Sequence, residues 1–233
     1  MSFCYFAFFR FPGDPADRRV SDADVSALHA MLGKLPSLQR GLVHLPAPRS
    51  TPHPFPNDEP SPALALQLYF ADIEGIENHL APTGALQALR AKGTFPSLDD
   101  AEIVQQQVML TRRFPAPGRP TTVAASYLVH YPGQPEDLNA WLAHYHEHHP
   151  GLMRGFPGIQ EIELYTRVDW VGFVPGRRVD FFQRNKQVFP DVKTLSDGLL
   201  SPAIKDMRAD YHRFPPFSGG NVHYPMYTKD VEI

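Results

Sequence analysis

Four histidines and one glutamate lie within six consecutive residues, from His144 to His149, and Pro150 follows directly. Histidine is the side chain whose ordinary pKa lies near neutral pH, and it is also the commonest metal ligand in proteins. This segment therefore indicates one of three things: acid–base chemistry, metal binding, or positive charge placed at the end of a helix.

A helix must position these side chains, and its start is predicted at Pro135 and the acidic pair that follows, with the helix covering 136–148. Apolar residues then recur at helical spacing and form a buried stripe: Leu138, Trp141, Leu142 and Tyr145. At about 100° per residue, His149 projects near the centre of this stripe, and His146 and His148 flank it on opposite sides. His144 and Glu147 are expected to face solvent.

Pro150 is expected to end the helix just after His148, because proline pushes the preceding residue out of the α region. Histidines in a last helical turn are favoured by the helix dipole and need no further function. The alternative is that at least one of them is an acid or base in a pocket. A metal site is the third interpretation, but His144 and His148 would need two further ligands and the His-Glu-x-x-His order is absent. We therefore predict no metal and no cofactor.

His148 is the preferred acid–base candidate, with Glu147 or Asp210 as the carboxylate that orients it. Asp210 has an alternative interpretation as a surface or capping group. His149 aligns with His29 in the first half of the chain, which favours a shared packing role, whereas His148 has no such counterpart. The side chains expected to contact a ligand are Trp141, Tyr145, His146, His149, His130 and His223.

The chain carries signs of an internal duplication with a spacing of 120 residues. Three short segments match at this spacing, each at a similar place in its half: residues 11–13 with 131–133, residues 67–69 with 187–189, and residues 80–82 with 200–202. A repeat of this length is a whole domain, not a unit of a solenoid. The predicted domains are residues 1–116, which include a Pro-rich loop at 46–62, and residues 120–233, which carry the histidines.

Each half has the same predicted order of elements, strand-helix-strand-strand-helix-strand, which is the ferredoxin-like plan. In the first half these are 3–11, 22–33, 41–45, 63–70, 73–92 and 101–112. In the second they are 123–131, 136–148, 159–170, 179–189, 192–212 and 221–227, with Pro225 placing the last strand at a sheet edge.

The first strand of each half, around Tyr5–Phe9 and Ser126–Val129, hardly alternates between apolar and polar residues. Both faces of these strands should therefore be covered, one by helices and the other by the second sheet. The predicted fold class is α+β: two ferredoxin-like βαββαβ repeats packed sheet to sheet as an α+β barrel within one chain.

Net charge and the length of apolar stretches limit the classes of partner that this chain is expected to bind. A formal charge of -3 leaves no basic surface for nucleic acid, and no apolar stretch approaches the length of a membrane span, so neither partner is expected. The one cysteine, Cys4, is expected to be a buried residue of a strand in a protein of the reducing cytoplasm. The apolar N-terminus is expected to be a strand and not a signal peptide.

Two segments resemble EthD-like proteins of the dimeric α+β barrel superfamily. Tyr145, residues 147–150 and the Phe-Pro-Gly-Ile at 156–159 are similar to the helix and turn of that family, in which a histidine is followed by x-Pro and then by Pro-Gly. Residues 200–202, Ala209–Asp210 and Phe214 resemble its later helix, and residues 80–95 echo that segment in the first half. Together the matches cover most of the chain, although the first half lacks the Glu-His pair.

The resemblance implies that His148 takes the place of the family histidine and Asp210 that of the family aspartate. It also implies a small-molecule protein: a cofactor-free catabolic or tailoring enzyme that moves a proton on a hydrophobic or aromatic organic compound. A non-catalytic ligand-binding or accessory protein of a degradation pathway is the alternative, and a metal- or haem-binding barrel is a weaker one. A homodimer of such chains is left open, and shared fold does not decide among these functions.

Overall fold

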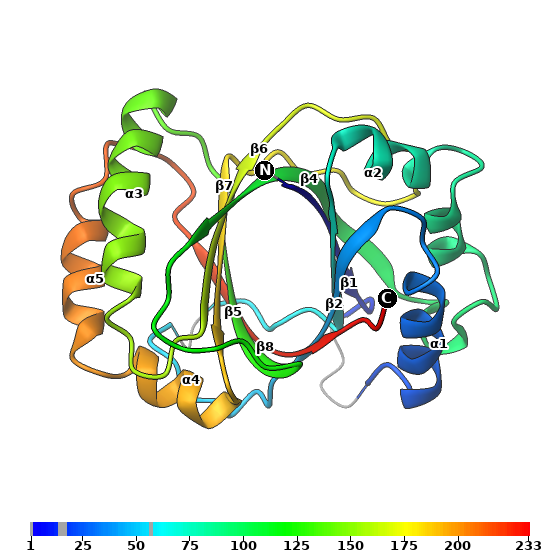
Figure 1. Ribbon diagram of the computed structural model, residues 1–233, viewed down its shortest axis with the longest axis horizontal. Helices are drawn as coiled ribbons and strands as arrows, with labels where there is room; N and C mark the ends of the chain where they lie inside the picture. Colours follow the sequence, from blue (N-terminus) through cyan, green and yellow to red (C-terminus); the bar gives the residue numbers. More distant parts are fainter. Residues whose placement is uncertain (1, 14–17, 56–57) are drawn as a thin grey trace.

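Antiparallel strands close into a single barrel in this structure, a computed structural model that describes residues 2–13, 18–55 and 58–233 (Figure 1). The strand order around the barrel is β1-β3-β2-β8-β5-β7-β6-β4, and β4 pairs with β1 to close it. The strand bounds are β1 (Ser2–Arg10), β2 (Leu38–Pro46), β3 (Leu64–Phe70), β4 (Glu102–Phe114), β5 (Val123–Tyr131), β6 (Glu161–Arg167), β7 (Gln183–Phe189) and β8 (Val222–Asp230).

Helices cover the outside of the barrel on two opposite sides (Figure 1). One side carries α1 (Asp22–Leu32) and α2 (Ile73–Leu80), with the 3-10 helices η1 (Ala85–Arg90) and η2 (Pro96–Leu98). The other side carries α3 (Leu138–Met153), α4 (Val192–Leu199) and α5 (Ala203–Tyr211). We call β1–β4 with α1 and α2 the first half, and β5–β8 with α3–α5 the second half.

Local sequence explains where most of these helices begin. The N-terminal caps of α1, α2, α3 and α4 are short polar residues whose side chains accept a hydrogen bond from a backbone N–H of the first turn: Ser21, Asp72, Asp137 and Asp191. Such caps satisfy donors that have no partner inside the helix. The predicted start of the histidine helix, beside Asp137, is therefore confirmed.

The first strand, β1, is covered on both faces, as expected from its lack of alternation. Tyr5, Ala7 and Phe9 pack under the helices of the first half, whereas Cys4 and Phe6 point into the barrel. The interior is filled by side chains, including a cluster in which the Lys186 ammonium lies 3.0 Å from the Glu163 carboxylate. Hydrogen bonds from two tyrosines and an arginine also reach Glu163, and its pKa is lowered to about 2 although burial opposes this.

Three predictions about element boundaries are wrong. The histidine helix does not end at His148, because α3 continues through Pro150 to Met153. Proline removes one helical hydrogen bond at a cost of about 3 kcal/mol, and the burial of His149, Pro150 and Met153 against the sheet offsets it. The segments 73–92 and 192–212 are each two helices, broken next to Pro82 and Pro202.

A fourth correction concerns Pro225, which was expected to mark an edge strand. In the closed barrel β8 lies between β2 and β5 and has no edge. The missing N–H costs little here, because the β2 ladder ends at Met226 and the Pro225 carbonyl accepts from Ala47 N at 3.2 Å.

Residues 67–69 and 187–189 match in sequence, but they do not occupy equivalent positions in the structure. Gln67 points into the barrel, where its amide donates to the Tyr165 hydroxyl at 2.6 Å, whereas Gln187 faces the helices. Side chains alternate along a strand, so a shift of one residue moves each of them to the other face. In the β-ladders Leu66 lies opposite Ala7 and Asn185 lies opposite Val129, and all four side chains face the helices.

Among the described residues, no helix is both long and apolar enough to cross a lipid bilayer.

Candidate functional site

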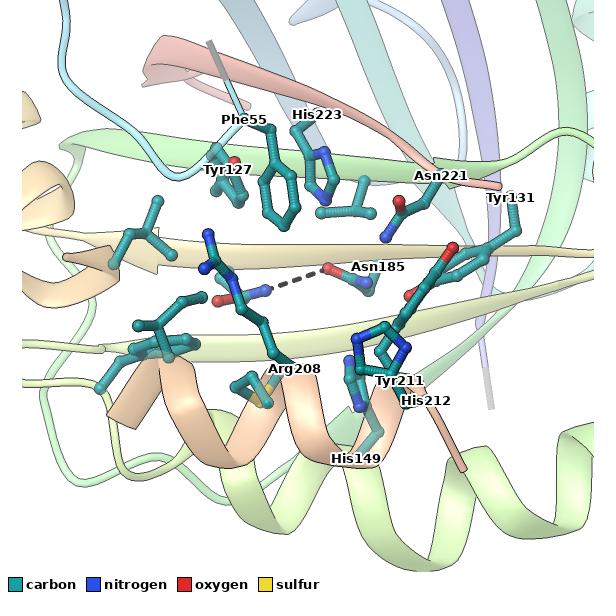
Figure 2. Close-up of a pocket in the computed structure, with 16 residues that line it drawn as sticks. Phe55, Tyr127, Tyr131, His149, Asn185, Arg208, Tyr211, His212, Asn221 and His223 are labelled. Atoms are coloured by element: carbon teal, nitrogen blue, oxygen red, sulfur yellow. Dashed lines mark hydrogen bonds between the residues drawn. The ribbon is translucent and has the colours of Figure 1, made fainter. Parts of the chain in front are cut away.

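A cavity of about 420 Å³ lies in the second half, between the outer face of the sheet and the helices α3 and α5 (Figure 2). Tyrosines, aliphatic residues, phenylalanines and a methionine form most of its wall, and amides, three histidines and one arginine complete it. The lining residues are Phe55, Tyr127, Val129, Tyr131, His149, Phe156, Asn185, Gln187, Leu199, Ile204, Met207, Arg208, Tyr211, His212, Asn221 and His223. Its size and apolar character are typical of small-molecule sites.

His149 reaches the cavity from α3 and is held by Asp210 of α5. The two side chains lie 2.7 Å apart, from His149 Nδ1 to Asp210 Oδ2, and both are nearly fully buried. The other carboxylate oxygen lies 3.1 Å from His144 Nε2, so Asp210 bridges two imidazoles of the histidine segment. Because a carboxylate accepts, Nδ1 of His149 carries the hydrogen.

The electrostatics keep His149 neutral and Asp210 ionised near pH 7. Burial lowers the pKa of His149 below its ordinary value of 6.5, and the contact with Asp210 offsets only part of this. Burial tends to raise the pKa of Asp210, but hydrogen bonds from His149 and His144 outweigh it and lower that pKa. His149 therefore presents the lone pair of Nε2, for which no hydrogen bond is found among the described residues. This is the arrangement of an oriented general base.

A second His–Asp pair lies at another wall of the same cavity. His223 of β8 lies 2.6 Å from Asp58, from Nδ1 to Oδ2, and its backbone N–H donates to the same oxygen at 2.8 Å. Its ring stacks on Phe55 with centroids 3.9 Å apart and on Tyr127 at 5.4 Å (Figure 2). Burial lowers the pKa of His223, against the effect of Asp58. The Pro-rich loop of the first half thus supplies part of a site in the second half.

Amide side chains of β7 line the sheet side of the cavity. Asn185 donates to the Tyr145 hydroxyl at 2.7 Å and accepts from the Gln187 amide at 3.3 Å (Figure 2). The side-chain oxygen of Gln187 is buried and has no hydrogen-bond partner among the described residues. Gln187 lines the cavity but is only 3% exposed, so this acceptor is an unsatisfied buried group next to the cavity.

The structure separates the residues that the sequence placed together. His148 and Glu147 are exposed and do not line the cavity, and His148 Nδ1 donates to the carbonyl of His144 at 2.9 Å. His146 is half-buried and lies outside the cavity lining. The geometry moves the acid–base candidate from His148 to His149, because His149 is the one histidine of this segment that lines the cavity. His144, which was expected to face solvent, instead contacts Asp210 of α5.

The other predicted contact residues are divided between the two sides of the sheet. Trp141 and Tyr145 are fully buried under the cavity and stack at 4.8 Å. His130 points into the barrel instead, where Arg184 donates to its Nδ1 at 2.7 Å. His223 and Asp210 are both at the site as described.

Sequence reasoning missed Asp58, Phe55 and the polar face of β7. Nothing local marks Phe55, which lines the cavity, or Asp58, which contacts His223, because both lie in a loop more than a hundred residues away from β8 in sequence. The strand β7 did carry a signal: its sequence QRNKQVF is mostly polar, yet every residue in it is buried. Buried polar side chains of this kind require partners or a ligand.

Within the described residues, no group of three or more His, Cys, Asp or Glu side chains is placed to hold a metal ion. His144 and His148 stack on each other at 4.5 Å, and Asp210 contacts only the first of them in addition to His149.

No protein-family model matches this sequence, and no curated protein matches it. Solved structures with a similar fold do exist. An anthrone oxidase-like protein superposes with a TM-score of 0.61 at 9% identity, over 100% of this chain and 94% of that chain. A candidate monooxygenase from Fusobacterium nucleatum gives 0.54 at 12% identity, over 99% and 92%.

A mutant chlorite dismutase from Candidatus Nitrospira defluvii gives a TM-score of 0.53 at 11% identity, over 97% of this chain and 90% of that chain. At such identities the likeness is one of fold. The chain shares with these structures an α+β fold built on a closed antiparallel barrel.

Proposed function

We propose that this protein is a cofactor-free enzyme that moves a proton on a hydrophobic, aromatic small molecule held in the second-half cavity. The observation that carries this proposal is the His149–Asp210 pair, which opens onto an apolar cavity with an unbonded imidazole nitrogen. The proposal keeps the reaction class expected from the sequence and replaces His148 by His149 as the base.

In the proposed reaction, Nε2 of His149 removes a proton from an acidic C–H or O–H group of the ligand. Asp210 holds the ring in the tautomer that has its hydrogen on Nδ1, and its charge stabilises the imidazolium that forms. The ring systems of Phe55, Tyr127 and Phe156 give the aromatic ligand an apolar environment, and exclusion of water strengthens the interaction between Asp210 and His149. The products are a deprotonated ligand and a protonated His149.

The architecture is also inferred to be a duplication. The strand orders β4-β1-β3-β2 and β8-β5-β7-β6 are the same in the two halves, and each half has helices on its outer face. This supports two ferredoxin-like repeats, near residues 1–116 and 120–233, within an EthD-like protein of a catabolic or tailoring pathway. The chain would then achieve alone the barrel that two subunits form in simpler relatives.

The proposed reaction can be tested with anthrone, whose activated C–H is a suitable acid, and an anthrone oxidase-like protein shares this fold. Deuterium incorporation at that carbon in D₂O, followed by NMR, measures proton removal directly. We expect wild type to accelerate the exchange and His149→Gln to slow it by about 10²-fold or more. Asp210→Asn should also shift the acid limb of the pH profile to lower pH, because Asp210 raises the pKa of His149.

His148→Ala is the matched control, since this imidazole is exposed, and its exchange rate should equal that of wild type. Anthrone that binds to the wild type without faster exchange would contradict catalysis and favour the alternative of a ligand-binding accessory protein. Equal exchange rates in wild type and His149→Gln would remove His149 from the mechanism.

A further inference from the structure

The charge of the cavity lining is one-sided. Among its residues there is one arginine and no aspartate or glutamate. Asp58 and Asp210, which each contact one histidine of the lining, are engaged by the Nδ1 of that histidine. A ligand in this cavity therefore meets no free negative charge from the lining, while Arg208 contributes a positive one.

Arg208 projects from α5 into the cavity toward Phe55 (Figure 2). Its position follows from the helix, because Ile204, Met207, Arg208 and Tyr211 recur at helical spacing and all line the cavity. One guanidinium nitrogen donates to the carbonyl of Pro54 at 3.4 Å, a long contact, and the group lies 5.8 Å from the centre of the Phe55 ring. No described carboxylate forms an ion pair with it. A guanidinium that has no carboxylate partner of its own can bind the carboxylate of a ligand with two parallel hydrogen bonds.

The opposite wall offers a hydrogen-bond acceptor. The side-chain oxygen of Gln187 is buried without a partner, and β7 faces α5 across the cavity. A buried acceptor of this kind costs about 1–3 kcal/mol when it is left unsatisfied. A ligand hydroxyl that donates to this oxygen would remove that cost, whereas an ether or a second carboxylate would not.

We infer that the ligand is a hydroxylated aromatic acid: a bicyclic or tricyclic ring system with its carboxylate on Arg208 and an O–H donor on Gln187. This inference rests on the proposed function and specifies its substrate class. The ring system occupies the apolar space between the two walls, and a volume of about 420 Å³ lies at the lower end of the range for small-molecule sites, which suits two or three fused rings.

Calorimetric titration of the full chain with three naphthalene probes tests this inference at pH 7.5. The first probe, 6-hydroxy-2-naphthoate, has both the carboxylate and the hydroxyl. The second, 2-naphthoate, lacks the hydroxyl. The third, the methyl ester of the first probe, lacks the negative charge. We expect 6-hydroxy-2-naphthoate to bind about fivefold more tightly than either of the others, because one hydrogen bond contributes about 1 kcal/mol and an ion pair near solvent contributes about as much.

Variants assign each preference to its residue. Arg208→Gln should abolish the preference for acid over ester and leave the preference for the hydroxyl, and Gln187→Leu should do the reverse. Lys205→Gln is the control on the same helix, since it removes an equal charge from an exposed residue that does not line the cavity. It should change no preference.

Three results would overturn the inference: an ester that binds wild type as tightly as the acid, equal effects of Arg208→Gln and Lys205→Gln, or no binding of any probe. The same titrations with His149→Gln separate this inference from the proposed reaction. Binding preferences that persist in a protein without proton-transfer activity would reject the enzyme and retain the ligand class.

Discussion

The two halves of the barrel use the same outer face of the same strand in opposite ways. In β3 the residues that face the helices are Leu64, Leu66, Leu68 and Phe70, all fully buried in the first-half core. In β7 they are Gln183, Asn185, Gln187 and Phe189. The leucines of β3 fill the space under the first-half helices, whereas Asn185 and Gln187 of β7 line a cavity. The polarity of one strand face therefore distinguishes a structural half from a binding half.

The buried faces of α1 and α3 also differ in polarity. The buried positions of α1 include Val25, Leu28 and Leu32, whereas α3 buries His149 at this face and pairs it with a carboxylate. A carboxylate is buried under α1 as well, but Asp24 accepts hydrogen bonds from the backbone and hydroxyl of Ser97 and holds a loop. The buried carboxylate of the first half thus holds a loop, whereas the buried carboxylate of the second half orients an imidazole that lines a cavity.

The largest effect is expected when an amide, as found on the helix-facing side of β7, replaces a leucine on the same side of β3. Leu66→Asn should lower the free energy of unfolding by about 3–5 kcal/mol, because it removes packed apolar volume and buries an amide without partners. Urea denaturation measures it. A loss below about 1 kcal/mol would show that the first half also tolerates a polar site, and the comparison would fail.

Replacing the amides of β7 by leucines, as in β3, should weaken binding strongly and leave the fold intact. In the double variant Asn185→Leu with Gln187→Leu, leucines occupy the cavity and remove the free acceptor, so 6-hydroxy-2-naphthoate should bind at least about tenfold more weakly. Stability should change by only about 1 kcal/mol, because both amides leave together and only the Tyr145 hydroxyl loses a partner. Unchanged affinity by calorimetry would place the ligand elsewhere.

His149 should contribute to the loss of stability at acid pH, together with the buried His44 of β2 and His130 of β5, whose pKa values are also lowered by burial. The folded pKa of His149 lies below its ordinary value of 6.5, so the unfolded chain takes up a proton first as the pH falls. The stability that neutral His149 contributes is present above about pH 6.5 and is lost as the pH falls through the folded pKa. The melting temperature should therefore fall between pH 7.5 and 5, and His149→Gln should flatten this decrease.

His29→Gln is the control in α1. The pKa of His29 is also lowered by burial, but this side chain is only half-buried, so its removal should flatten the decrease less than His149→Gln does. Equal flattening by the two variants would assign the acid sensitivity to burial in general and not to the candidate site.

The smallest effect is expected for the exposed part of the histidine segment. Glu147→Ala and His148→Ala should each leave the free energy of unfolding within about 0.5 kcal/mol of wild type and leave probe affinity unchanged, because neither side chain touches the cavity. Thermal melts and calorimetry measure both. A tenfold loss of affinity in His148→Ala would return the role to the residue that the sequence favoured.

Much of the architecture could be predicted because strand and helix periodicity are local properties. The β1, β3 and β5 segments are apolar over their length, and the structure has each of them as a strand within two residues of the prediction. The helical projection also identified His149 as the residue at the centre of the buried stripe. The sequence favoured His148 over His149 because a central position in the stripe indicates packing, and because the partner of His149 lies 61 residues away.

Sequence by itself determined that both faces of the first strands are buried, that each half runs through the same order of elements, and that histidines cluster on one helix. These properties depend on neighbouring residues and on periodicity. Only the tertiary structure decided which histidine meets a carboxylate, that α3 continues past Pro150, and that Phe55 lines a cavity of the second half while Asp58 holds His223 there. Those contacts join distant segments, and they exist because the barrel closes.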